Sequence, residues 1–156
     1  MNGQSWDMRA IRFGRSAEAL VGTPFKLYGR NAAVGLDCVG VVVNALANAG
    51  LKVPQLPEYS LRNLDDAPFI AATRNANFEP CDTNADVAAG DLLMVAPGTA
   101  QAHLLIAVSG GGLVHAHAGL RRVVRMPGPC PWPLRYHFRL RRARDSTSTY
   151  ETRSAG

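Results

Sequence analysis

The chain has 156 residues, of which 17 are basic and 12 acidic, for a formal net charge of +5 at pH 7. This length suits a single domain, because domains most often contain roughly 100–150 residues, and the composition excludes a collagen, a coiled coil and a wholly disordered chain. The charge is uneven: residues 1–120 hold eight basic and ten acidic side chains (−2), whereas residues 121–156 hold nine arginines and two acids (+7).

The N-terminal segment shows no sign of an export leader. Arginines interrupt every apolar cluster of residues 1–22, and no apolar run in the chain approaches the roughly 18 residues of a membrane-spanning helix. We therefore expect synthesis in the cytoplasm without a signal peptide, and no membrane insertion. The three cysteines show no CxxC spacing, so we expect neither a zinc knuckle nor a disulfide scaffold.

The first half of the chain has the patterns of helices joined by loops. Loosely helical apolar spacing predicts a helix over residues 7–21, which the segment Gly22-Thr23-Pro24 ends. Residues 29–36, with a glycine near each end, are expected to form a loop, as is the stretch 52–64 with its prolines. A second amphipathic segment predicts a helix over about 65–75, with Asp65 and Asp66 at its positive end.

Residues 38–50 leave two possibilities open. The four valines of this stretch favour a strand, whereas its length, its alanine-rich second half and the terminal Gly50 favour a helix. We expect a helix here, with Asp37 at its N-cap.

After Gly90 the pattern changes to short β-rich runs separated by Gly, Pro and Ser. Four such runs predict a meander of antiparallel strands: Asp91–Ala96, His103–Val108, Leu113–His117 and Arg122–Met126. Leu134–Leu140 alternates apolar and basic residues and is expected to add a half-exposed outer strand. Helices followed by strands indicate an α+β domain over residues 1–143, with a disordered tail over 144–156.

Cys38 is the candidate nucleophile among the three cysteines. It follows a glycine-containing loop and opens the expected helix, where the helix dipole and unsatisfied N–H groups are expected to lower the pKa of the thiol. The same N–H groups are able to stabilise an oxyanion. Cys81 lies in a polar connection and Cys130 in the turn PGPCPWP, and both are interpreted as structural.

A thiol nucleophile needs an imidazole to move its proton and a polar group to orient that imidazole. His103 begins one expected strand, and His115 and His117 lie on the next. Because side chains alternate along a strand, these histidines share a face only if the numbers of paired residues have an even sum. A register with 105 opposite 115 would place His103 a diagonal step from His115.

Four motifs in this order resemble those of the NlpC/p60 family, papain-like cysteine peptidases that act on bacterial cell walls. They are Gly22-Thr23-Pro24-Phe25, Gly35-Leu36-Asp37-Cys38-Val39-Gly40, Gly90-Asp91-Leu92-Leu93, and the run from His103 to Ala116. The short form and the following PEYS stretch are most similar to the phage-type peptidases, found also among gene-transfer-agent and prophage tail genes.

The resemblance implies a papain-like fold in which the cysteine helix packs on an antiparallel sheet. It implies Cys38 as nucleophile, His103 as general base and acid, and His115 as the residue that orients His103; only this spacing separates His115 from His117. The implied substrate is a peptidoglycan stem peptide, often cut at a D-γ-glutamyl–diaminopimelate bond, with phage-tail or gene-transfer-agent proteins as partners and no cofactor or metal.

The candidate oxyanion and substrate-binding residues are Phe25, Tyr28, Asp37 and His117. The family commonly has Tyr where this chain has Phe25, and that hydroxyl serves the oxyanion side of the site. The Phe25 side chain has no hydrogen-bond donor, so either the Tyr28 hydroxyl substitutes from another position or backbone N–H groups act alone. Loss of one such donor costs around 10²–10³ in rate.

Three rival interpretations remain. Cys38 with His103, His115 and His117 offers zinc-ligand chemistry. An assembly or structural role in a phage tail tip, with weak or no peptidase activity, is favoured by Phe25. The arginine-rich end, with Trp132, Tyr136 and Phe138 interleaved, resembles a nucleic-acid surface, although a solvated strand face explains it better, and we expect no nucleic acid partner.

Overall fold

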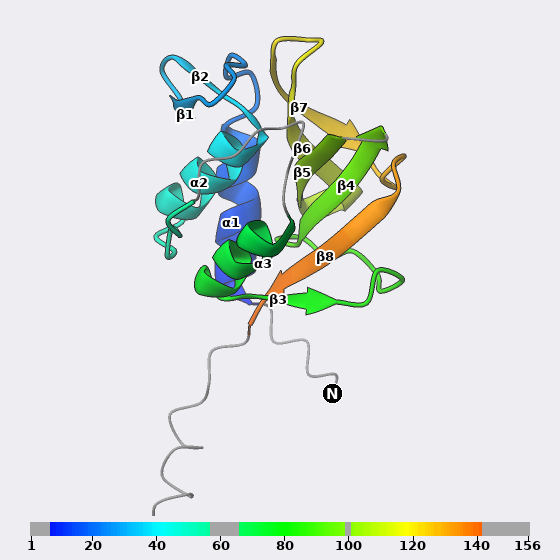
Figure 1. The fold of residues 1–156 in the computed structure, drawn as a ribbon. Coiled ribbons are helices and arrows are strands. Elements are labelled where there is room, and N and C mark those ends of the chain that lie inside the picture. The colour runs from blue at the N-terminus through cyan, green and yellow to red at the C-terminus, as the bar shows by residue number, and fades with distance from the viewer. Residues whose placement is uncertain (1–6, 57–65, 99–100, 142–156) are drawn as a thin grey trace, which may run out of the picture.

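The computed structural model describes residues 7–56, 66–98 and 101–141. Within these ranges the chain has a helical layer packed on one face of an antiparallel six-stranded sheet (Figure 1). The helices are α1 (Met8–Ala19), α2 (Cys38–Asn48) and α3 (Asp66–Asn75). The strands of the large sheet are β3 (Phe78–Cys81), β4 (Leu92–Gly98), β5 (Gln101–Ala107), β6 (Gly112–His117), β7 (Arg122–Pro127) and β8 (Leu134–Leu140). The α+β prediction is confirmed.

The helices lie close to where the sequence predicts them. Helix α2 is a helix rather than a strand, and it begins at Cys38 because the Asp37 side chain accepts from the Gly40 N–H at 2.8 Å. It ends at Asn48, and Gly50, two residues further on, has a φ of +72°. There the Gly50 N–H donates to the Ala47 carbonyl and the Leu51 N–H to the Leu46 carbonyl, the pair of bonds that closes a helix on a left-handed glycine.

The strand order is β3-β8-β4-β5-β6-β7, so the expected meander holds for β4 to β7. The prediction of an outer strand is wrong for β8, which lies between β3 and β4 with His137 and Phe138 fully buried. Strand β3 was not predicted, and Cys81 lies on it rather than in a connection. Pro80 hides the strand from sequence patterns, and β3 accommodates it because it is an edge strand.

The loop predicted over residues 29–36 contains two further short strands, β1 (Arg30–Asn31) and β2 (Gly35–Leu36), which pair with each other above α2 (Figure 1). The helix expected over about 65–75 is present as α3, Asp66–Asn75. Asp65, most of the expected 52–64 loop and the expected 144–156 tail lie outside the described residues.

Apolar side chains fill both faces of the large sheet. The larger cluster lies between sheet and helices and includes Phe13 of α1, Val39 of α2 and Ile106 of β5. A smaller cluster contains Leu93, Val95, Leu105, Ala107 and Leu113, and is covered by Met126, Cys130, Trp132 and Leu134. Among the described residues, no helix is long and apolar enough to cross a membrane.

Candidate active site

Cys38 is the first residue of α2, and its side chain is only 2 % exposed. Helix α2 packs against β5 and β6. The backbone N–H groups of Leu104 and Val39 favour the charged form of the thiol and act to lower its pKa. The buried start of the helix therefore holds the sulfur against the strand that carries His103.

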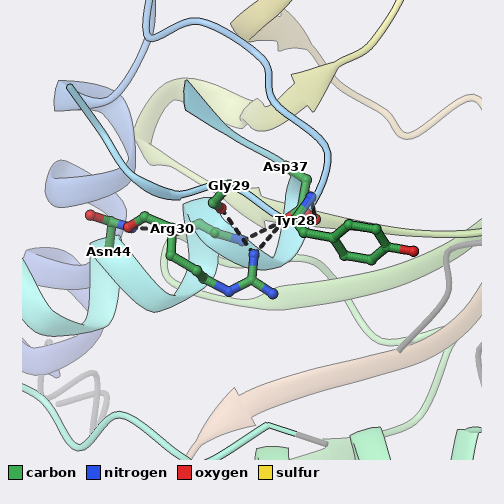
Figure 2. A network of polar contacts seen from close by, with 6 residues as sticks. Tyr28, Gly29, Arg30, Asp37 and Asn44 are labelled. Carbon is green, nitrogen blue, oxygen red and sulfur yellow. Dashed lines mark hydrogen bonds and ion pairs between the residues drawn. The ribbon is translucent and has the colours of Figure 1, made fainter. Parts of the chain in front are cut away.

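The loop before α2 is tied to the helix start by the Asp37 carboxylate (Figure 2). Besides the Gly40 N–H, this carboxylate accepts from the Tyr28 N–H at 3.0 Å and from Arg30 Nη1 at 2.9 Å. Asn44, one turn into the helix, donates to the Arg30 carbonyl. Asp37 is fully buried, and its contacts make it the helix N-cap and the anchor of the loop.

Gly40, two residues after Cys38, lies where there is no room for a side chain. A Cβ at Gly40 would lie 2.1 Å from the Gly29 carbonyl oxygen, far inside contact distance. Only glycine at this position lets the Tyr28–Arg30 loop approach the helix start. The motif Asp37-Cys38-Val39-Gly40 is thus a packing unit that sets the cysteine beside the loop.

The histidines meet as the register argument predicts. Strands β5 and β6 pair at Ile106 with Val114 and at Ala107 with Leu113, an even register. His103 Nε2 and His115 Nδ1 form a hydrogen bond of 2.8 Å, with the ring planes at 85°. This bond occupies Nε2 of His103 and leaves Nδ1 as the ring nitrogen that can exchange a proton with a thiol.

His117 has a different role from His115. Its ring centroid lies 5.7 Å from that of His115, and its Nδ1 accepts from the Leu120 N–H at 3.0 Å. Among the described residues, His115 rather than His117 bonds His103. The geometry agrees with the role that the family resemblance implies for His115.

Cys38, His103, His115 and His117 line one cleft of about 630 Å³. Phe25 and Tyr28 line it as well, together with Trp132. Phe25 is half-buried, and its N–H donates to the Arg121 carbonyl. Tyr28 is exposed and has a φ of +60°, and Figure 2 shows its ring directed away from Asp37 and Arg30. Of the site residues predicted from the sequence, only Asp37 lies outside this lining.

Burial and neighbouring charge set the protonation states of the site. Burial, with the Asp37 carboxylate as the second cause, raises the pKa of the Cys38 thiol to about 12. Burial first, then the electrostatic influence of the neighbouring His115 and His117, lowers the pKa of His103 to about 4. Burial and His117 lower the pKa of His115 to about 4. The expected lowering of the thiol pKa is wrong for the unliganded site, because burial outweighs the helix terminus, and the resting pair is a neutral thiol and a neutral imidazole.

Trp132 is the cleft residue that the sequence analysis missed. Its only signal was an aromatic residue in a proline-rich turn, and it was grouped with Tyr136 and Phe138 as a nucleic-acid surface. Those three do not form an exposed row, because Phe138 is fully buried and Trp132 faces the cleft. In residues 7–56, 66–98 and 101–141 no group of three His, Cys, Asp or Glu side chains is arranged to hold a metal.

The glycine–aspartate motif at Gly90 and Asp91 lies away from this cleft. Gly90 has a φ of +90° and approaches Ala10 so closely that a Cβ would lie 2.5 Å from the Ala10 carbonyl oxygen. The buried Asp91 carboxylate accepts from His137 Nε2 at 2.6 Å and from Arg139 at 2.9 and 3.0 Å. Arg139 is therefore not simply a solvated charge: it clamps β8 to the start of β4.

Comparison with known proteins gives a family and a fold. A model of the NlpC/P60 family matches residues 22–137, and no match was found among the curated proteins. The peptidoglycan hydrolase RipB from Mycobacterium tuberculosis is 19 % identical, with a TM-score of 0.60 over 92 % of this chain and 70 % of that one. The NlpC/p60 domain of the peptidoglycan hydrolase SagA is 20 % identical, with a TM-score of 0.57 over 84 % and 98 %.

NlpC1 from Trichomonas vaginalis is 14 % identical, with a TM-score of 0.61 over 82 % of this chain and 42 % of its own length. This chain thus spans less than half of that protein. At these identities the solved structures establish the fold, and the family model covers the segment from Gly22 to His137. The chain belongs to the NlpC/P60 family.

Proposed function

We propose that this protein is a cysteine peptidase that hydrolyses stem peptides of peptidoglycan. The observation that carries the proposal is the convergence of Cys38 and the hydrogen-bonded His103–His115 pair on one cleft. Membership of the NlpC/P60 family supports it, as does the likeness to two proteins described as peptidoglycan hydrolases. The finer specificity we propose is the D-γ-glutamyl–diaminopimelate bond.

The reaction begins from the neutral pair. His103 Nδ1 takes the thiol proton as the Cys38 sulfur attacks the amide carbonyl, which gives a tetrahedral oxyanion and an imidazolium. His103 then gives this proton to the leaving amine, and the C–N bond breaks to leave a thioester. Water, deprotonated by His103, attacks the thioester and releases the carboxylic acid and the thiol. His115 accepts from His103 Nε2–H throughout, which keeps Nδ1 directed to the reaction.

The oxyanion is assigned to backbone donors at the start of α2. Asp37 caps the Gly40 N–H, while the N–H groups of Cys38 and Val39 belong to the first turn, which has no intrahelical acceptors for them. Phe25 adds no donor from its place in the cleft. The absence of a hydroxyl at Phe25 also favours a second candidate function, that of a phage-tail assembly protein with little peptidase activity. In either case we propose that the protein associates with phage-tail or gene-transfer-agent proteins and acts at the cell wall.

The test is digestion of purified sacculi and of a γ-D-glutamyl–diaminopimelate peptide, with products identified by mass spectrometry. Wild type is expected to cleave, and Cys38→Ala and His103→Ala are expected to be inactive while still folded. Cys130→Ala is the matched control, because this half-buried cysteine packs on the smaller apolar cluster. Full cleavage by Cys38→Ala would overturn the proposal, and intact sacculi with wild type would favour the assembly protein.

A further inference from the structure

Trp132 touches both histidines of the pair. Its ring centroid lies 6.1 Å from that of His103 and 5.7 Å from that of His115, with interplanar angles of 88° and 81°. Perpendicular contacts at these distances are among the favoured geometries of aromatic pairs. The indole comes from the segment between β7 and β8 and packs on the apolar cluster around Leu105, so its own position is supported from behind.

Hydrogen bonding alone does not hold the two imidazoles in the reactive arrangement. If His103 is to accept a proton at Nδ1, it must carry hydrogen on Nε2 and donate it to His115 Nδ1. His115 then carries its own hydrogen on Nε2. That atom is buried, and no hydrogen-bond partner reaches it among the described residues. Apart from the backbone of Ala116, which favours its charged form, His115 is therefore fixed by its bond to His103 and by the rings around it.

The positive charge that forms on His103 during the reaction also needs stabilisation. The described side chains that line the cleft include no carboxylate, and the nearby Asp37 is buried and ion-paired with Arg30. The face of an aromatic ring attracts an imidazolium through the ring quadrupole. Trp132 is the aromatic residue in contact with both imidazoles.

Building on the proposed function, we propose that Trp132 is a positioning residue that holds the His103–His115 pair in its reactive orientation and stabilises the imidazolium of His103. It acts through the histidines and forms no bond to substrate. The role predicts that an aromatic ring is needed at position 132, whereas apolar volume alone is insufficient.

The test measures alkylation of Cys38 by iodoacetamide between pH 4 and 9 in the full chain. The modified Cys38 peptide is quantified by mass spectrometry, so that Cys81 and Cys130 do not interfere. The variants are Trp132→Phe and Trp132→Leu, with Trp132→Met should the leucine variant not fold. Met126→Ala is the matched control, because Met126 packs on the same apolar cluster.

In wild type, His103 is expected to accelerate alkylation relative to His103→Ala. Trp132→Leu should lose about tenfold of this acceleration, the size expected of an aromatic contact with added cation–π attraction. Trp132→Phe should stay within about threefold of wild type, because it keeps a ring against the imidazoles. Met126→Ala should be unchanged. Long-range ¹H–¹⁵N spectra should place the hydrogen of His103 on Nε2 in wild type and show mixed tautomers in Trp132→Leu.

A folded leucine or methionine variant with wild-type alkylation and one tautomer would overturn the proposal, as would an equal loss in Met126→Ala. Alkylation that is independent of His103 would remove its basis and that of the proposed function together. The assay needs no substrate. If the alkylation results are as expected but the wild-type protein leaves sacculi intact, the proposed function is refuted and the role of Trp132 is still supported.

Discussion

Replacing Asp37 by asparagine should destabilise the protein and make the Cys38 thiol more acidic. One carboxylate oxygen accepts from the Gly40 N–H and Arg30, and the other accepts from the Tyr28 N–H. Asparagine keeps one oxygen but directs an NH₂ group at a backbone donor, and an unsatisfied buried group costs about 1–3 kcal/mol. The ion pair adds at most about 1 kcal/mol, because the Arg30 side chain is 35 % exposed. We expect a loss of about 1–4 kcal/mol in the free energy of unfolding.

The thiol should respond in the opposite sense. After burial, the Asp37 charge is the largest cause that raises the pKa of Cys38, whereas the Arg30 charge lowers it. Asp37→Asn should therefore lower this pKa. Arg30→Met, the matched control, should raise it and cost less stability, because the carboxylate keeps both backbone N–H bonds.

Urea unfolding followed by circular dichroism measures the stability change. Iodoacetamide alkylation of Cys38 at pH 9 measures thiol acidity, in a His103→Ala background so that the imidazole does not contribute. The reasoning is refuted if Asp37→Asn loses less than about 0.5 kcal/mol, below the net value of even one hydrogen bond. It is also refuted if Asp37→Asn and Arg30→Met change the alkylation rate in the same direction.

Three further changes test other parts of the molecule. Phe25→Tyr should raise kcat on a stem peptide by up to about 10²–10³ through an added oxyanion donor; a kcat no higher than that of Phe25→Leu would contradict this role. The pKa values of His103 and His115 are lowered to about 4 in the folded protein, so the unfolded chain binds more protons than the folded protein between pH 6.5 and 4. The free energy of unfolding should therefore fall as pH drops from 6.5 to 4. The loss should be smaller in His103→Gln, by up to about 1.4 kcal/mol per pH unit; equal urea midpoint shifts in both proteins would be inconsistent with a buried neutral His103. Asp91→Asn should cost about 1–3 kcal/mol, because an amide replaces the carboxylate that His137 and Arg139 share, while the folded fraction keeps wild-type kcat; an unchanged melting temperature would refute the clamp.

Much of the candidate site was predictable because its signals are local. An acidic cap followed by an apolar run and a glycine favours a helix that begins at Cys38 over the strand that the valines suggest. Strand alternation places His103 and His115 on a shared face only under an even register, and the sequence leaves that register open because both faces of these strands are apolar. The prediction of the helix needed only residues a few positions apart, whereas the even register is a property of the folded sheet.

The order of the strands in the sheet was harder to predict from the sequence. The alternation of Leu134–Leu140 is typical of a strand with one wet face, but the buried Asp91 and the unpaired edge of β4 draw β8 inward to pair with β4. His137, which the pattern groups with the exposed basic residues, becomes a buried partner of Asp91. A pairing of residues almost fifty positions apart leaves no periodic trace in the sequence.

By itself, the sequence determined the α+β class, the helix that presents Cys38 and the two strands that carry the histidines, because caps, glycines and side-chain periodicity act over a single turn or pleat. Only the tertiary structure decided the position of β8, the arrival of Trp132 beside both imidazoles and the neutral resting state of the thiol. All three depend on contacts between segments that are far apart in the sequence, and the thiol is neutral because those segments bury it away from water. The same distinction applies to the basic end of the chain. Its charge is evident from the composition, but the contact of Arg139 with Asp91 exists only in the folded sheet.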